Sequence, residues 1–531
     1  MDATFATVDY LVLFAYLIGT VGIGLYFWRN RRPTAAEFTT GGRNLSGWLC
    51  GLSIFATFLS SITFLALPGM AFDNDWNFFV FSLTLPIAAW IAARWFLPYY
   101  RNNQDASAFA MFERRFGLWA RWMASLLFLL VQLARMAFVT YLMALPLGLV
   151  FQWDIRLLIV ITGLIVIFYA AIGGIVAVIW ADAIQAVVLT VGAVVALVAI
   201  VNGLPNGISD VWQAAFEPQP SKFSLGTFDW KTWKGSAFWM VFAYGLFENI
   251  RNFGVDQNYI QRYVSARPKD AVWSLWFGAL MYVPISALFL LIGTSLFAFY
   301  QYHPADLREV RQIVRQQRSL SEPRTSPSIE SLPDGKPTIA ENENDFKLGD
   351  RVFPHYIAKY LPAGVKGLLI AAIFSAAMST ISTSLNSVAT IALSDFYMRS
   401  WDPNATEAAQ LHVLRTATVV AGLMSVGGAI ALVSLSGSAL DNWWSVSSVL
   451  GTGVLGLFCL GRLSKQADWL DATIGLLVGL MIVVLLMFGQ PWLLGSVLFD
   501  VKLSIVVGTV SVVLVGGGCS VARHMNRTGL G

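Results

Sequence analysis

Apolar stretches of roughly 20 residues, separated by shorter polar segments, recur along the whole sequence. A helix of that length crosses a hydrocarbon core of about 30 Å, and windows of this kind predict about 13 membrane spans. They fall near residues 8–27, 46–70, 77–97, 122–151, 157–175, 180–201, 236–255, 271–299, 366–394, 413–434, 441–460, 469–489 and 503–522. Because the mean hydropathy is +0.64, we expect an all-α membrane protein with the lipid bilayer around it.

The distribution of Lys and Arg predicts how the chain is oriented, because cytoplasmic loops are the basic ones. One set of short loops carries most of this charge: Arg29, Arg31, Arg32, Arg43, Arg101, Arg114, Arg115, Arg262, Arg267, Lys269, Arg399, Arg462, Lys465, Arg523 and Arg527. The opposite loops hold only Arg156, Lys222, Lys231, Lys234 and Lys502. We therefore expect a multi-pass protein of the cell (inner) membrane, with its N-terminus outside and its C-terminus in the cytoplasm. The first span has no signal-peptide flanks and is expected to be retained.

Several classes of function are disfavoured by what the sequence lacks. The basic residues flank apolar spans instead of forming one patch, so nucleic acid is not an expected partner. The three cysteines and four histidines are scattered and make neither a disulfide framework nor a metal-ligand pair. We find no Ser-His-Asp set, HExxH helix or paired catalytic carboxylates, and therefore expect no enzyme. The sequence also has no Walker-type loop, so active transport would draw on an ion gradient.

Two polar segments interrupt the series of spans. Residues 202–235 carry Trp212, Trp230 and Trp233 and are expected to form an external loop with interfacial aromatic side chains. Residues 301–350 are rich in Pro, Ser and charge, so much of that segment is expected to be disordered. Its stretch "ADLREVRQIVRQQRSL" is compatible with a short helix.

The span "WLCGLSIFATFLSSITFLALPGMAF" (48–72) has an unusual interior. Small and hydroxyl residues interrupt it, namely Gly51, Thr57, Ser60, Ser61 and Thr63, and Pro68-Gly69 closes it. Unwound backbone at membrane depth is tolerated only where protein or a water-filled cavity satisfies its polar groups, and such breaks mark ion and substrate sites. The alternative is an intact helix whose small residues allow close packing.

The stretch "AAMSTISTSLNS" (376–387) places six hydroxyl side chains within a membrane span. Ser379, Ser382 and Thr383 are spaced i, i+3 and i+4 and share one helix face, with Thr380 on the adjoining side. A hard cation prefers oxygen ligands, so this face is a candidate cation site. The alternative is that the hydroxyls bond to their own helix or mediate helix contacts.

Charged residues at membrane depth are functional by default, because a charge there costs at least about 2.5 kcal/mol. Asp182 could neutralise a bound cation, and Arg135 offers a bidentate fork for a carboxylate. The alternatives are an interfacial aspartate and an arginine paired with a helix carbonyl.

Glu248 and Arg251 lie one turn apart and are expected to neutralise each other. Their stretch, "GLFENIRNFGVDQNYIQRYVSA", is too polar to face lipid and suggests a second broken span that faces a cavity.

The sequence resembles the sodium:solute symporters, and most closely their bacterial sialic-acid branch. The matching motifs are "GGRNLSGW", "GLSIFATFLSSITFLALP", "DWNFF", "YAAIGGIVAVIWADAIQ", "DQNYIQRYVSA", "FPHYIAKYLPAGVKGLLIAAIFSAAMSTISTSLNSVAT" and "SDFY". The resemblance implies LeuT-like inverted five-helix repeats with broken first and sixth core helices. It divides the chain into an N-terminal helix and cytoplasmic loop (1–45), a first repeat (46–201), an extracellular loop (202–235), a second repeat including the polar extracellular insertion 301–350 (236–434), and C-terminal helices (435–531).

The resemblance also implies site residues. The main sodium site would use the backbone carbonyls of Ala56, Leu59 and Ala376 and the hydroxyls of Ser379 and Thr380. A second sodium site, found in some members, would use Asp182, Ser379, Ser382 and Thr383, whereas Ser384 and Ser387 are expected to be packing residues. Substrate-binding positions would be Arg135, Ser60, Thr63, Ser82, Phe78 and Asn249. The chain departs from the branch at Ser82, where a glutamine is usual, at Phe58, where a threonine is usual, at Glu248 and Arg251, which replace neutral residues, and in its long insertion.

We therefore expect a sodium-coupled secondary active symporter, a monomer, that imports a small organic solute by alternating access. Arg135 favours a carboxylate such as sialic acid. The alternative is a neutral sugar or polyol, with Arg135 paired internally, for example to Glu248. A membrane sensor is the alternative of another class, and the cytoplasmic signalling domain that it would need is not recognisable in the sequence.

Overall fold

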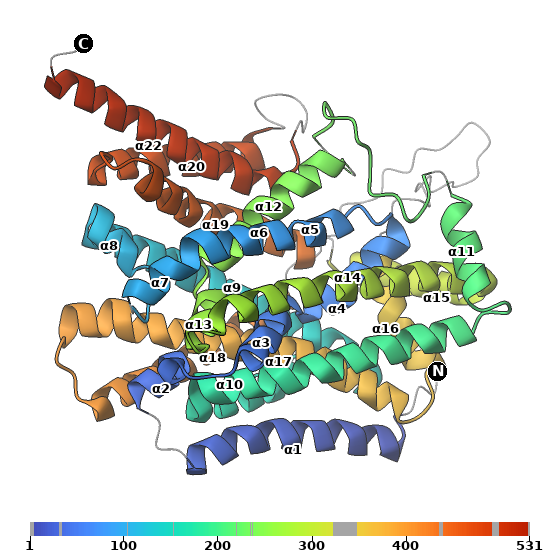
Figure 1. Ribbon diagram of the computed structural model, residues 1–531. Helices are drawn as coiled ribbons and strands as arrows, with labels where there is room; N and C mark the ends of the chain where they lie inside the picture. The colour runs from blue at the N-terminus through green and yellow to red at the C-terminus, as the bar shows by residue number, and fades with distance from the viewer. Residues whose placement is uncertain are drawn as a thin grey trace.

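The computed structural model describes residues 5–30, 34–103, 105–151, 153–218, 220–233, 235, 237–321, 348–434, 439–490 and 499–528. Within these ranges the fold is helical, and β-structure is limited to two isolated bridges. Figure 1 shows the long helices lying side by side, with α1 at one edge of the bundle and α20 and α22 at the opposite edge. The predicted all-α membrane fold is confirmed.

The helices before the long external segment are α1 (Thr7–Asn30), α2 (Ala35–Thr40), η1 (Gly41–Arg43), α3 (Gly47–Phe58), α4 (Ser61–Asp73), α5 (Phe79–Leu83), α6 (Leu85–Ile91), η2 (Ala92–Phe96), α7 (Leu97–Asn103), α8 (Ala110–Phe116), α9 (Leu118–Phe151), α10 (Ile155–Asn202), α11 (Ile208–Phe216), α12 (Phe238–Val255), α13 (Gln257–Ser265) and α14 (Ala271–Tyr302). The remaining ones are α15 (Pro304–Ser321), α16 (Gly349–Tyr360), α17 (Val365–Ile391), η3 (Ala392–Trp401), α18 (Glu407–Leu432), α19 (Ala439–Leu463), α20 (Trp469–Val484), η4 (Leu485–Gly489), η5 (Val501–Leu503) and α22 (Ser504–Thr528).

Nine helical segments in the described ranges are long and apolar enough to cross a membrane, and the bent pair α3 and α4 forms a tenth. The predicted span at 77–97 consists of four consecutive pieces, α5, α6, η2 and α7. The predicted spans at 157–175 and 180–201 both lie in α10, which has 48 residues. At 1.5 Å per residue such a helix would be about 72 Å long, more than twice the hydrocarbon thickness. A break is therefore required within it.

The break in α10 lies at Gly174, whose backbone angles are φ 57° and ψ −168°. This region of backbone space is open essentially only to glycine. A β-carbon added there would also lie 2.8 Å from Phe38 Cδ2 and 3.0 Å from Phe38 Cα. Glycine at this position thus turns the chain between two spans and lets α2 pack closely against the turn.

A Gly174→Ala variant is expected to lose about 2–3 kcal/mol of stability, because alanine must adopt a strained conformation against Phe38. Thermal unfolding of the purified protein in detergent measures the loss. Gly427→Ala is the matched control, since Gly427 lies in α18 with nothing within 4 Å of the added carbon. An equal melting temperature for the two variants would contradict this account of the turn.

Two spans are broken in the middle, as the sequence predicts. The α3 and α4 segments meet at an angle of 52°, and Ser60 caps α4 by accepting a hydrogen bond from the Thr63 amide. The α12 and α13 segments meet at Asp256, which has extended backbone angles of φ −91° and ψ 118°. Its carboxylate accepts a 2.8 Å hydrogen bond from the Asn258 amide and caps α13. Polar capping residues thus satisfy backbone groups where each helix is interrupted.

Helix α17 forms the centre of the bundle. It contacts α1, α3, α9, α10 and α18. The hydroxyl run of the sequence lies on this helix, and every residue from Leu369 to Ile391 is buried. The polar side chains of α17 therefore face protein and not lipid.

The two polar segments contain more helix than the sequence indicates. The predicted loop 202–235 includes α11, and the predicted short helix after residue 304 is confirmed as α15. The rest of the expected disorder, residues 322–347, lies outside the described residues.

Lys222 of the first loop donates hydrogen bonds to the carbonyls of Phe72 and Asn74, at 2.6 and 2.8 Å. Burial lowers the pKa of Lys222 to about 8, although Asp73 and Asp75 act against this shift. The loop thereby caps the C-terminal end of α4.

Candidate functional site

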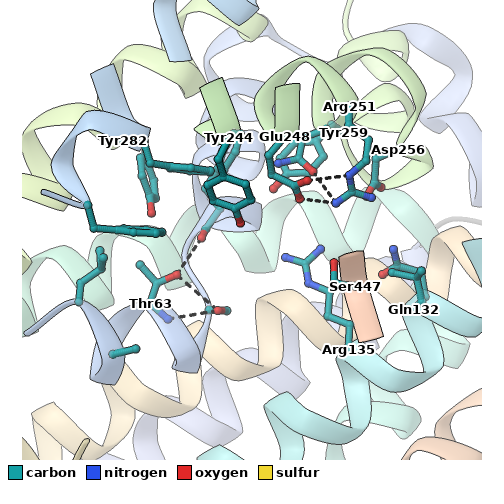
Figure 2. A pocket seen from close by; sticks show the side chains of 18 of the residues that line it. Thr63, Gln132, Arg135, Tyr244, Glu248, Arg251, Asp256, Tyr259, Tyr282 and Ser447 are labelled. Atoms are coloured by element: carbon teal, nitrogen blue, oxygen red, sulfur yellow. Dashed lines mark hydrogen bonds and ion pairs between the residues drawn. The ribbon is translucent and has the colours of Figure 1, made fainter. Parts of the chain in front are cut away.

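A cavity lies beside both broken helices. It is lined by Phe58, Ser60, Thr63, Ala66, Leu67, Met70, Phe78, Phe81, Val131, Gln132, Arg135, Tyr244, Glu248, Arg251, Asn252, Asp256, Tyr259, Tyr282 and Ser447. Figure 2 shows Thr63 on one side, Arg135 and Gln132 on another, and Glu248, Arg251 and Asp256 above them. The cavity thus joins polar groups from α4, α9, α12 and the break before α13.

Arg135 reaches this cavity from α9, in the middle of the membrane-spanning region. Its Nη2 donates a 3.2 Å hydrogen bond to the carbonyl of Thr57, at the end of α3. Among the described residues, none of the carboxylates forms an ion pair with it. The guanidinium therefore has donors left for a ligand in the cavity.

Glu248 and Arg251 form the ion pair that their spacing predicts. Arg251 Nε donates to Glu248 Oε2 at 3.0 Å, and Arg251 Nη2 pairs with Glu248 Oε1. Arg251 also donates to Asn252 Oδ1 at 3.3 Å. Both carboxylate oxygens of Glu248 are thus engaged by Arg251, so the pairing of Glu248 with Arg135, considered with the alternative substrate class, is not formed. The pair is local, one turn apart on α12, whereas Arg135 comes from a different helix.

Ser60, Thr63 and Phe78 lie on the cavity wall, as expected of substrate-binding residues. The hydroxyls of Ser60 and Thr63 are 3.4 Å apart, and Thr63 also donates to the carbonyl of Phe58 at 3.2 Å. Phe78 stacks on Phe81 with an interplanar angle of 8°. Polar groups at the helix break and an aromatic wall are the usual elements of a small-molecule site.

Ser82 and Asn249 are placed differently from the expectation. Neither residue is among those that line the cavity. Asn249 is fully buried, and its amide donates to the Phe81 carbonyl at 3.2 Å and to Thr84 Oγ1 at 2.9 Å. Asn249 thus joins α12 to the α5 and α6 segments, and in this conformation it is a structural contact. Ser82 is 2% exposed and lies on α5 next to Phe81, which does line the cavity.

The residues implied for the main sodium site lie where α3 ends next to α17. Leu59, which follows α3, has extended angles of φ −89° and ψ 106° and donates to the Ala56 carbonyl at 3.1 Å. On α17, Thr380 Oγ1 donates to the Ala376 carbonyl at 3.1 Å. The Ser379 hydroxyl is buried without a hydrogen-bond partner. A broken helix end and a free hydroxyl supply the neutral oxygens that a sodium ion takes as ligands.

The residues implied for the second sodium site surround an arginine. Asp182 Oδ2 accepts hydrogen bonds from Ser53 Oγ at 2.5 Å and from Arg262 Nη2 at 3.0 Å. The same Nη2 donates to Thr383 Oγ1, and Arg262 Nε donates to Ser53 Oγ at 2.8 Å. The side chains of Asp182 and Arg262 are both fully buried. Ser382 donates to the Ser379 carbonyl at 3.2 Å.

Two residues of this arrangement, Arg262 and Ser53, are missed by the sequence reasoning. Arg262 is counted there among the basic residues of a cytoplasmic loop, and this is wrong, because its guanidinium lies inside the bundle. The available signal is the residue pattern of "YIQRYV", in which aromatic and apolar residues flank the charge on both sides. Asp182, by contrast, is fully buried inside the helix bundle, as expected of a functional carboxylate.

The remaining hydroxyls of α17 support the helix packing. Ser384 donates to Gln132 Oε1 at 2.8 Å, and Ser387 donates to Gln261 Oε1 at 3.1 Å. Both partners lie on other helices, α9 and α13. These contacts agree with the structural role expected for the two serines.

Two interrupted helices that meet at a polar cavity, around a buried helix with free hydroxyls, define a secondary active transporter. The sequence profile of the sodium:solute symporter family matches residues 38–319 and 332–479. The chain therefore belongs to the sodium:solute symporter family. The predicted class, a sodium-coupled symporter, is confirmed by this membership.

Relatives of known activity match nearly the whole chain. The sodium/sialic acid symporter NanT of Aliivibrio fischeri is 32% identical over 519 residues, which are 97% of this chain and 93% of the relative. The sodium/sialic acid symporter SiaT of Proteus mirabilis is 32% identical over 515 residues, 96% and 94% of the two chains. A solved structure of the substrate-bound outward-open state of a Na+-coupled sialic acid symporter superposes with a TM-score of 0.82 and 32% identity, covering 96% of this chain and 97% of that one.

Proposed function

We propose that this symporter imports a small organic anion, a carboxylate such as sialic acid, together with sodium ions. The observation that carries the proposal is Arg135, which lines the cavity with free donors and has no ion-pair partner among the described carboxylates. A guanidinium in such a place favours a planar anion, because a carboxylate accepts two parallel hydrogen bonds from it. The 32% identity to two sialic acid symporters supports the same substrate class.

Each group of the cavity has a proposed role. Arg135 binds the substrate carboxylate, and the hydroxyls of Ser60 and Thr63 bind its polar substituents. Phe78 packs against the apolar part of the substrate. Glu248 and Arg251 line the same cavity as an ion pair that is neutral as a unit, so Arg251 does not compete with Arg135 for the carboxylate.

Sodium is proposed to bind at the break between α3 and α4. The main ion is proposed at the carbonyls of Ala56, Leu59 and Ala376 with the hydroxyls of Ser379 and Thr380. A second ion is proposed at Asp182, Ser379, Ser382 and Thr383, the set that the resemblance implies. The break that follows Thr57 contains Leu59, which is proposed to bind the ion, and Ser60, which is proposed to bind the substrate. Bound sodium therefore orders the segment that the substrate contacts. Coupling of this kind is reciprocal, so substrate also tightens sodium binding.

Alternating access is proposed to come from the two repeats, residues 46–201 and 236–434, rocking around the cavity. The protein is proposed to act as a monomer in the inner membrane, with its N-terminus outside and its C-terminus in the cytoplasm. Accessibility of single cysteines introduced near the two termini to a membrane-impermeant reagent tests this orientation. Labelling of the C-terminal position in intact cells would contradict it.

Uptake into proteoliposomes tests the proposed transport directly. Labelled sialic acid is expected to accumulate with an inward sodium gradient and not with a potassium gradient of the same size. Equal rates with the two cations would contradict sodium coupling. Uptake of a neutral sugar or polyol without uptake of any carboxylate would favour the alternative substrate class.

Removing the Ser379 hydroxyl is expected to raise the sodium concentration for half-maximal uptake by about tenfold or more. A hydrogen bond or ligand contact to a charged group contributes about 1.5–3 kcal/mol, and 1.4 kcal/mol corresponds to a factor of ten. Uptake rates of Ser379→Ala, measured across sodium concentrations, give the shift. Ser387→Ala removes a hydroxyl from the same helix at a structural contact and serves as the control. An unchanged sodium dependence in Ser379→Ala would contradict its place in the ion site.

A further inference from the structure

The ion pair of Glu248 and Arg251 forms part of the cavity wall on α12. The side chains of Glu248 and Arg251 are 16% and 12% exposed, so both keep some surface beside the cavity. Arg251 uses Nε and Nη2 to engage the two carboxylate oxygens of Glu248. Each carboxylate oxygen accepts up to two hydrogen bonds. Glu248 therefore has acceptor sites left after Arg251 has bound it.

The guanidinium of Arg251 is held in place by contacts with two helices. Its Nη2 also donates to Asn252 Oδ1 on α12, at 3.3 Å. On α19 it packs against Gly451, where an added β-carbon would lie 3.3 Å from Nη1. These contacts keep the guanidinium on Glu248 and thereby fix the position of the carboxylate.

The ion pair lies on the same side of the cavity as Arg135. Figure 2 shows Glu248, Arg251 and Asp256 grouped above Arg135, whereas Thr63 lies on a different side. The Asp256 carboxylate interacts electrostatically with both Arg135 and Arg251, which places the two arginines in one neighbourhood. A substrate whose carboxylate binds to Arg135 therefore brings the atoms next to that carboxylate toward Glu248.

Pairing with Arg251 makes Glu248 compatible with an anionic substrate. An unpaired glutamate would repel the substrate carboxylate, because like charges interact strongly away from bulk water. As one half of an ion pair, Glu248 is an acceptor in a unit without net charge. An ammonium group is a poor match for that unit, since the substrate carboxylate is already balanced by Arg135 and the extra positive charge would stay uncompensated. A hydroxyl donates a hydrogen bond and brings no charge.

We propose that Glu248 determines specificity by accepting a hydrogen bond from a hydroxyl on the carbon that bears the substrate carboxylate, with Arg251 as its positioning residue. The substrate class is then a 2-hydroxy acid, to which sialic acid belongs. A plain monocarboxylate leaves the acceptor sites of Glu248 unused and binds more weakly. The inference rests on the binding of the substrate carboxylate by Arg135 that is proposed above.

Competition against the sodium-driven uptake of labelled sialic acid in proteoliposomes tests the inference on the wild type. Unlabelled sialic acid is expected to inhibit at a concentration at least about tenfold lower than its 2-deoxy analogue, as a hydrogen bond to a charged group predicts. Lactate should likewise inhibit more strongly than propionate or alanine. Equal inhibition by sialic acid and the 2-deoxy analogue, or stronger inhibition by alanine than by lactate, would overturn the inference.

A double variant shows whether this discrimination comes from the ion pair. Glu248→Met with Arg251→Met removes both charges together, because a single change would leave the other charge unpaired. The ratio of the two inhibitory concentrations should fall below about threefold, a change that a purely structural role would not produce. Asp105→Ala with Arg114→Ala removes an ion pair outside the cavity and should keep the ratio. An unchanged ratio in the first double variant would contradict the role of Glu248.

A conservative double variant keeps the test decisive if the first one does not fold. Glu248→Gln with Arg251→Gln retains polar side chains at both positions. Its ratio should also fall, because hydrogen bonds to an uncharged acceptor are about half as strong. A lack of sodium-dependent uptake of any carboxylate would overturn the proposed transport function itself. Uptake with equal inhibition by sialic acid and its 2-deoxy analogue would overturn only the role of Glu248.

Discussion

Replacing Arg135 by alanine is expected to reduce the uptake of sialic acid by about 30-fold to 3,000-fold. Truncating one partner of a buried, hydrogen-bonded charge pair costs about 2–5 kcal/mol, and each 1.4 kcal/mol is a factor of ten. The loss should be of this size because the carboxylate of the substrate would enter the cavity without a counter-charge. Initial rates of labelled uptake in proteoliposomes, with sodium held at saturation, measure it.

Two further variants show whether the loss of uptake is due to the bidentate guanidinium of Arg135. Arg135→Lys keeps the charge and loses the bidentate geometry, so it should restore only part of the uptake. Arg156→Ala removes an arginine from the start of α10, away from the cavity, and is the matched control. Unchanged anion uptake in Arg135→Ala would exclude the proposed role and favour a neutral sugar or polyol as the substrate.

The second large effect is expected at the buried pair of Asp182 and Arg262. Asp182→Asn and Arg262→Ala should each lower the free energy of unfolding by about 3–5 kcal/mol, because each leaves a charge buried without its partner. The measurement is unfolding of the purified protein in detergent with choline in place of sodium, so that ion binding does not contribute to stability.

The double variant Asp182→Asn with Arg262→Ala removes both charges together. It is expected to lose clearly less stability than the two single variants combined, since residues in direct contact are not additive. Arg114→Ala breaks an ion pair whose arginine side chain is 44% exposed, and should cost about 1 kcal/mol or less. Equal losses of unfolding free energy in Arg114→Ala and in the Asp182 and Arg262 single variants would contradict a stabilising role for the buried ion pair.

The two broken spans illustrate what can be predicted from local sequence. Hydroxyl residues and glycine within "GLSIFATFLSSITF", and the polar run around Asp256, mark the breaks directly because they leave too few apolar side chains for a continuous lipid-facing helix. The spacing of Ser379, Ser382 and Thr383 likewise places them on one face. The ion pair of Glu248 and Arg251 is equally predictable from the sequence, since partners one turn apart meet on any helix.

The placement of Arg262, Asn249 and Ser82 could not be predicted in this way. A charged or polar residue near a break points into a cavity, into a neighbouring helix or toward the cytoplasm according to how the helix after the break is rotated. That rotation depends on packing between segments far apart in sequence, here α13 against α3, α7 and α17. The local sequence therefore places Arg262 in a loop, and the family resemblance alone places Asn249 among the substrate ligands.

The sequence by itself determined the membrane class, the all-helical fold, the two breaks and the family, because all of these follow from local composition, periodicity and motifs. The tertiary structure decided which oxygens remain free. Arg262, Asp182 and Thr383 are separated by at least 80 residues along the chain, and only the packing of their helices brings the guanidinium onto one oxygen of Asp182 and leaves the other open. The reason is physical: a charge in a low-dielectric interior must be paired, but its partner is chosen by the fold.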